Sequence, residues 1–75
     1  MQIHIGNLIR NEVRRQGCTN EWLADRIGVS IRTLQRIYNK PSIDTNLLLR
    51  LSIALRTNLF HPYTRQLARM TNTVT

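Results

Sequence analysis

The sequence predicts a small all-α domain of four or five short helices. Apolar residues recur at intervals of three and four along most of the chain, and residues that favour helix ends stand between these runs. No segment shows the alternation typical of a strand. At 75 residues and 41% hydrophobic content, the chain is long enough for one modest core and too short for a second domain. We assign residues 1–69 to this domain and residues 70–75 to a flexible C-terminal tail.

The first two helices are marked by their apolar spacing and their ends. A helix is predicted over about residues 3–16, followed by Gly17 as a C-terminal cap. Thr19 is the predicted N-cap of a second helix that runs to Ile27, and Glu21 favours its positive end. The apolar positions of the first helix are Ile5, Leu8, Ile9 and Val13.

Three further helices are expected. Ser30 is the predicted N-cap of a helix over about residues 31–39, and Asp44 or Thr45 caps a fourth helix. A fifth helix is predicted over about residues 59–68, with Pro62 in its first turn. The broad apolar side of the fourth helix comprises Leu47, Leu48, Leu51, Ala54 and Leu55.

The second and third helices have the spacing of a helix-turn-helix. Ala24 is small enough for two helices to cross closely, and Gly28 suits a turn with a positive φ. The apolar residues predicted to face inward are Leu23, Ile27, Val29, Leu34 and Ile37. The residues left on the outer face of the third helix are Ser30, Ile31, Arg32, Thr33, Gln35, Arg36 and Asn39. We predict that bases are read from this outer face.

The charge of the chain indicates a polyanionic partner. There are 11 Lys+Arg against 4 Asp+Glu, which gives a net charge of +7, and all but one of the cations are arginine. Arg32 and Arg36 are four residues apart on one helical face, so both fit a single major groove and can pair bidentately with guanine. The alternative for each arginine is a phosphate contact that carries no sequence information.

Other classes of function find little support. Cys18 is the single cysteine, and with His4 and His61 it lacks the spacing of a metal site, so neither metal nor cofactor is expected. No serine, cysteine or histidine has a plausible base beside it, so the chain is not predicted to be an enzyme. No apolar run approaches the length of a membrane span, and we expect a cytoplasmic protein that takes no small-molecule ligand.

From about Gly6 to Phe60 the chain resembles the Cro-like and lambda-repressor-like transcriptional regulators of the XRE type. A narrower set of short bacterial regulators is similar at residues 4–6, 22–24, 42–45 and 59–60. The resemblance implies a lambda-repressor-like fold and a sequence-specific regulator of double-stranded DNA in the bacterial nucleoid. We expect a repressor, because a domain this small has little surface left to recruit polymerase. The resemblance also implies a homodimer on DNA and phosphate contacts from Thr19, Asn20 and Lys40.

The chain departs from that family at one pair of positions. Many relatives have an arginine late in the first helix and a glutamate late in the third, which pair beneath the phosphate contact. Val13 and Tyr38 stand at these positions here. An apolar pair can replace a partly buried ion pair without loss of stability, so we predict that Val13 and Tyr38 touch. The phosphate contact that depends on the ion pair in those relatives lacks this support here.

Two alternatives to duplex DNA binding are considered. The first is a protein-interaction module, such as an antitoxin-like subunit, that keeps the fold but does not read DNA. The second is the binding of single-stranded nucleic acid. Single-strand binding is disfavoured because the aromatic residues are scattered over three helices. These residues are Trp22, Tyr38, Phe60 and Tyr63.

A set of surplus apolar residues has two possible roles. These residues either form the dimer contact or let the fifth helix cover the fourth: Leu49, Ile53, Leu59, Phe60, Tyr63 and Leu67.

Overall fold

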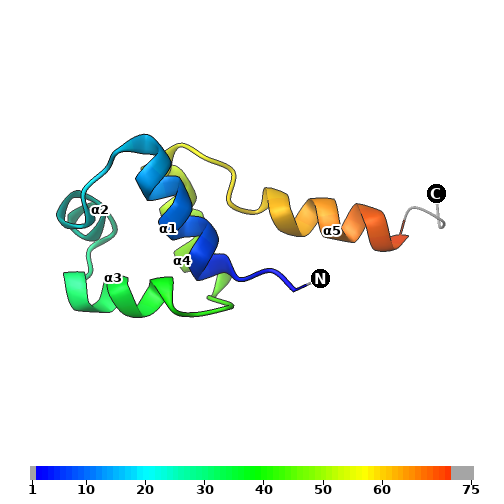
Figure 1. The fold of residues 1–75 in the computed structure, drawn as a ribbon, viewed down its shortest axis with the longest axis horizontal. Coiled ribbons are helices and arrows are strands. Elements are labelled where there is room, and N and C mark those ends of the chain that lie inside the picture. The colour runs from blue at the N-terminus through cyan, green and yellow to red at the C-terminus, as the bar shows by residue number, and fades with distance from the viewer. Residues whose placement is uncertain (1, 72–75) are drawn as a thin grey trace.

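The computed structural model describes residues 2–71 and has five helices and no strand in that range (Figure 1). The helices are α1 (Ile5–Gln16), α2 (Asn20–Ile27), α3 (Ile31–Tyr38), α4 (Thr45–Leu55) and α5 (His61–Thr71). The predicted all-α class is confirmed, and the fifth helix is present. Within the described range, no helix combines the length and the apolar character needed to cross a membrane.

The helix ends follow from local capping chemistry. Thr19, Ser30 and Asp44 each accept a hydrogen bond from the backbone N–H three residues later, at 3.0, 3.1 and 2.7 Å. Gly17 and Gly28 end α1 and α2 with φ of 73° and 75°, a region in which glycine lacks the steric penalty of other residues. These five positions have the roles predicted from the sequence.

The bounds of α1 and α5 differ from the predicted ones by two or three residues. α1 begins at Ile5 rather than Ile3, because His4 has an extended backbone and its Nδ1 accepts a hydrogen bond from the N–H of Asn7 at 3.1 Å. α5 begins at His61 because residues 58–60 form a turn, and it continues to Thr71. Residues 70 and 71, which the sequence placed in the tail, therefore belong to α5, and residues 72–75 lie outside the described range.

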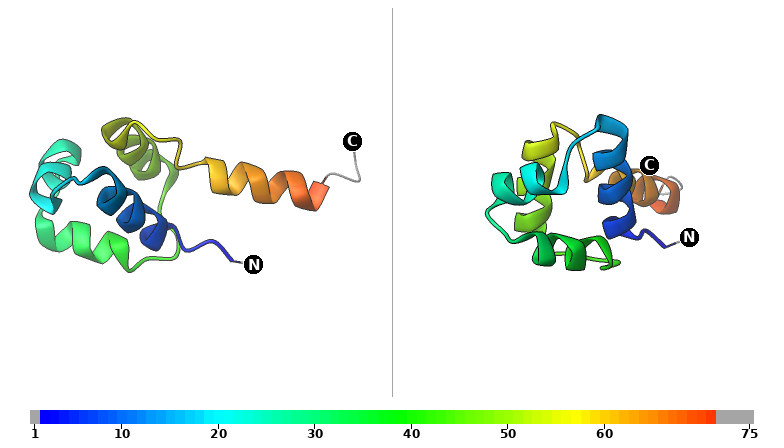
Figure 2. Two further views of the ribbon diagram at one scale, coloured as in Figure 1. Left: turned by 45° about the horizontal axis from the view of Figure 1, so that its top comes forward. Right: turned by 60° about the vertical axis from the view of Figure 1, so that its left-hand side comes forward.

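Helices α1 to α4 surround one hydrophobic core (Figure 2). All inward positions predicted for α2 and α3 are buried, except Val29, which is half-buried against the core. α1 crosses the end of α3 closely: the N–H groups of Ile5 and Gly6 donate to the carbonyls of Pro41 and Lys40 at 3.0 and 2.9 Å. The largest fully buried side chains are Ile5, Ile9, Leu23, Leu34, Leu51 and Leu55.

The fifth helix projects away from this core (Figures 1 and 2). Phe60 and Tyr63 pack partly against the core, but no residue of α5 itself is buried. Leu67 is 61% exposed. This exposure excludes the alternative in which α5 covers α4. Leu49 and Ile53 are also exposed on α4 and are free to contact another molecule.

A polar cluster joins α1 to the turn after α4. The carboxylate of Glu12 accepts hydrogen bonds from Arg15 Nε at 3.0 Å, Gln16 Nε2 at 2.6 Å and Thr57 Oγ1 at 3.0 Å. Gln16 also donates to the carbonyl of Leu55 at 2.7 Å. The hydrogen bond from Arg15, aided by those from Gln16 and Thr57, lowers the pKa of Glu12 to about 2 against the opposing effect of partial burial.

This lowered pKa predicts a loss of stability in acid. The unfolded chain protonates Glu12 near 4.5 and the folded chain only near 2, so the contribution is complete above 4.5 and disappears as the pH falls through 2. The loss should be modest, because Arg15 is largely exposed to solvent. Urea unfolding across this pH range should show a flatter dependence for Glu12→Gln. If the free energy of unfolding of Glu12→Gln changed as steeply with pH as that of the parent chain, the lowered pKa of Glu12 would not be the cause.

Candidate nucleic-acid interface

The outer face of α3 presents a group of long polar side chains to solvent. Arg32, Gln35 and Arg36 are exposed, and they lie opposite the side of α3 that is buried through Leu34 and Ile37. Within residues 2–71 no hydrogen bond engages the side chains of Arg32, Gln35 or Arg36. Their donors are therefore available to a partner that lies along α3.

Other residues predicted to read bases have structural partners. Ser30 Oγ accepts from the N–H of Thr33 and donates to its Oγ1, both at 3.1 Å, so the two hydroxyls form the cap of α3. Asn39 Oδ1 accepts from Arg10 at 3.3 Å, which leaves the amide nitrogen of Asn39 as its free donor. Ile31 is 41% exposed beside the first turn of α3, where it offers an apolar contact.

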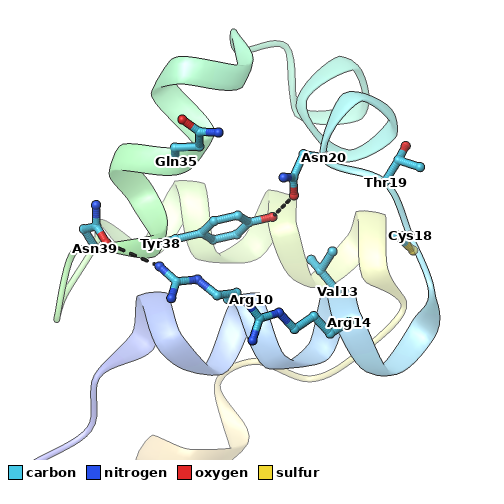
Figure 3. Close-up of a pocket in the computed structure, with 9 residues that line it drawn as sticks. All are labelled: Arg10, Val13, Arg14, Cys18, Thr19, Asn20, Gln35, Tyr38 and Asn39. Carbon is cyan, nitrogen blue, oxygen red and sulfur yellow. Dashed lines mark hydrogen bonds between the residues drawn. The ribbon is translucent and has the colours of Figure 1, made fainter.

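A pocket of about 590 Å³ lies between α1, the start of α2 and α3 (Figure 3). It contains two cations and no carboxylate. It also includes the first residue of α2, where the positive end of the helix dipole favours anions. Gln35 and Asn39 belong to both this pocket and the outer side of α3. The lining residues are Arg10, Val13, Arg14, Cys18, Thr19, Asn20, Gln35, Tyr38 and Asn39.

Tyr38 connects α3 to the start of α2. Its side chain is buried, and its hydroxyl donates to Oδ1 of Asn20 at 2.8 Å (Figure 3). Burial raises the pKa of Tyr38 above its ordinary value of 10, more than the nearby Arg10 lowers it, so the phenol stays a donor at neutral pH. Because Oδ1 of Asn20 is engaged, Nδ2 is left as the free donor of this carboxamide.

Arg10 lies across the ring of Tyr38. The guanidinium carbon is 5.5 Å from the ring centroid, a cation–π arrangement, and Nη2 also donates to Asn39. Val13 lines the same pocket and is buried in the same core cluster as Tyr38, and Tyr38 is not exposed. These positions agree with the predicted contact between Val13 and Tyr38.

Two of the three residues predicted to contact phosphate line the pocket, and the third lies outside it. Thr19 caps α2 and lines the pocket, and Asn20 is oriented there by Tyr38. Lys40 lies outside the pocket just after α3, with its side chain exposed and its carbonyl bonded to the N–H of Gly6. The pocket therefore brings together two of the three.

Sequence reasoning missed Arg10, Arg14 and the hydroxyl of Tyr38 as parts of this site. A signal was present, because Arg10 and Arg14 are four residues apart and flank Val13 on α1. In the part of the chain that the structure describes, no three His, Cys, Asp or Glu side chains gather into a possible metal site.

The comparisons with known proteins give no neighbour: no family model, no curated protein and no solved structure matches this chain. The role of the pocket and of the outer face of α3 therefore has to be inferred from their chemistry. Two features carry that chemistry, the cationic lining of the pocket and the unpartnered donors of α3.

Proposed function

We propose that this protein is a sequence-specific regulator that binds double-stranded DNA through a helix-turn-helix formed by α2 and α3. The observation that carries the proposal is the continuity of two surfaces through Gln35 and Asn39. One surface is the outer side of α3 with its exposed arginines, and the other is the carboxylate-free pocket at the start of α2. A duplex presents bases and phosphates side by side, which is the pattern these two surfaces match.

The pocket is the proposed site of a backbone phosphate. Arg10 and Arg14 supply positive charge, the start of α2 supplies its dipole, and Nδ2 of Asn20 supplies an oriented donor. The tyrosine hydroxyl takes over the orienting role that an ion pair has in many relatives of the family this chain resembles. The phosphate contact of Asn20 is therefore supported by the hydrogen bond from Tyr38 rather than by an ion pair.

The exposed side of α3 is the proposed base-reading surface. Arg32 and Arg36 are suited to the O6 and N7 acceptors of guanine, and Gln35 is suited to adenine. A single α3 contacts few base pairs, so we propose that two copies bind inverted half-sites about one helical turn apart and act as a repressor. The exposed Leu49 and Ile53 of α4 are available for contact between the copies.

The selection of random duplexes by the purified protein, at near-physiological salt and with excess competitor, tests this function. We expect an inverted repeat with a G·C pair at matched positions of its half-sites. Retention without an enriched motif would reduce the activity to charge-driven binding. A complete lack of retention would contradict the proposal and favour a protein-interaction module.

A second test addresses the orientation of Asn20. Tyr38→Phe removes the hydroxyl and keeps the ring, so we expect affinity for the selected duplex to fall about fivefold, the equivalent of one hydrogen bond of about 1 kcal/mol. Tyr63→Phe is the matched control, because Tyr63 lies at the start of α5 outside the pocket. Titration by fluorescence anisotropy measures both variants.

A double-mutant cycle shows whether the hydroxyl acts through Asn20. Asn20→Ala should weaken binding in the parent chain, and adding Tyr38→Phe to it should then have little further effect. Thermal unfolding of each variant checks that the core is intact. Additive losses from the two substitutions would mean that Tyr38 contributes to stability or binding independently of Asn20.

A further inference from the structure

Helix α5 has unsatisfied apolar surface. No residue of α5 is buried, and Leu67 and Met70 are 61% and 74% exposed near its end. Isolated helices shorter than about 12–15 residues are marginal in water, and most helices in proteins are stabilised by packing. α5 has 11 residues and little packing beyond its first turn, so a partner that covers it would stabilise it.

A groove of about 640 Å³ runs between residues 2–8 and α5. Four apolar residues line it: Ile3, Leu8, Pro62 and Met70. Arg65 and Arg69 add two cations on the α5 side, and no carboxylate lines the groove. Its occupant must therefore bring an apolar stripe and negative charge together.

This combination distinguishes between the possible occupants. A phosphate backbone offers negative charge but no apolar surface to cover Leu8 and Met70. A two-fold pairing of α5 with its copy would set Arg65 and Arg69 against the same cations, which is repulsive. Few carboxylates of a second copy are free: Glu12 is paired with Arg15 and Asp44 caps α4.

The remaining side-chain carboxylates, those of Glu21 and Asp25, are also unsuited to the groove. Glu21 and Asp25 are both on α2, which lies at the end of the molecule opposite α5 (Figure 1). An antiparallel two-fold pairing could bring α2 of each copy to α5 of the other, but each copy has a net charge of +7, and this charge opposes their approach. Charge and apolar character together favour a different protein.

We propose that the groove between residues 2–8 and α5 binds an acidic amphipathic helix of another protein. The apolar face of that helix covers Leu8 and Met70, and its carboxylates pair with Arg65 and Arg69. This is recognition of a helix in a groove, in which spaced apolar anchors give affinity and charge gives selectivity. The proposal does not depend on DNA binding by α3, because none of the residues that line the groove belongs to α3.

The test uses a labelled synthetic helix and the full chain. The probe is an amidated peptide of about four helical turns with leucine at helical intervals and glutamate elsewhere, and its control has lysine in place of glutamate. Fluorescence anisotropy should show binding of the acidic peptide and none of the basic one. In NMR spectra the backbone amide signals of Leu8 and Met70 should shift on addition of the acidic peptide.

Two charge-reversed variants separate this site from α3. Arg65→Glu/Arg69→Glu should weaken peptide binding about tenfold and leave binding to the selected duplex much less affected. Arg32→Glu/Arg36→Glu makes the same change in net charge, and it should lose the duplex while keeping the peptide. Circular dichroism confirms that both variants are folded. Peptide binding by the parent chain, combined with its failure to retain any duplex, would refute the proposed function and support this site.

Several outcomes would overturn the proposal. One is that the acidic peptide does not bind, and another is that both charge-reversed variants lose peptide binding equally. A dimer in light scattering that Met70→Asp dissociates would assign the groove to a second copy. Shifts of Leu8 and Met70 caused by duplex DNA alone would assign it to nucleic acid.

Discussion

The Gly6→Ala variant is expected to be strongly destabilised relative to the parent chain. A Cβ at Gly6 would lie 2.2 Å from the carbonyl oxygen of Tyr38 and 2.5 Å from that of Ile37, and both are backbone atoms that cannot rotate away. The closest approach of α1 and α3 would have to open, and the hydrogen bond from Gly6 to Lys40 would be lost with it. We expect a loss of about 3–5 kcal/mol, against about 1 kcal/mol of helix propensity gained by alanine.

A matched control is available at Gly17. There a Cβ meets no atom within 4 Å, and only the positive φ of 73° opposes the substitution. Gly17→Ala should therefore cost about 1 kcal/mol. Urea or thermal unfolding followed by circular dichroism compares the two variants. If Gly6→Ala were no less stable than Gly17→Ala, the close crossing of α1 over α3 would be wrong.

Arg32→Ala and Arg36→Ala are expected to have the largest effects on recognition. The proposed bidentate pair with guanine is worth about 1–3 kcal/mol against the wrong base, so affinity for the selected duplex should fall about 10- to 100-fold. Specificity should relax at one base pair for each variant, and that pair identifies the base each arginine reads. Both residues are exposed and without partners in the described chain, so stability should change little.

The control for these variants is Arg69→Ala. It removes one positive charge from α5, away from α3, and should weaken binding to all duplexes slightly and equally. Repeating the selection of random duplexes with each variant measures the loss of base specificity directly. A uniform loss across sequences for Arg32→Ala and Arg36→Ala would place both arginines on phosphates rather than bases.

The parts of the fold that depend on neighbouring residues were predictable. Thr19, Ser30 and Asp44 cap helices because their side-chain oxygens reach an N–H three residues away, and such a contact is visible in the sequence. His4 was missed as a cap because histidine is not among the residues that favour this position, although its Nδ1 makes the same kind of bond. The inward and outward sides of α2 and α3 followed from helical periodicity.

The parts that depend on distant contacts were not predictable in the same way. The bond from Tyr38 to Asn20 joins residues on α3 and α2, and it exists only because the core buries Tyr38 between α1 and the start of α2. Arg10 becomes part of the site only when α1 packs across α3. The direction of α5 is set by the turn at residues 58–60, which apolar spacing alone did not reveal.

The position of Arg10 has a consequence for the free energy of the proposed anion binding. A free arginine side chain loses rotamer entropy when it is fixed on a ligand, at a cost of about 0.5–1.5 kcal/mol. The ring of Tyr38 and the amide oxygen of Asn39 already restrict Arg10 in the unliganded protein. Much of that ordering is thus completed during folding, and an anion that enters the pocket meets a preorganised guanidinium.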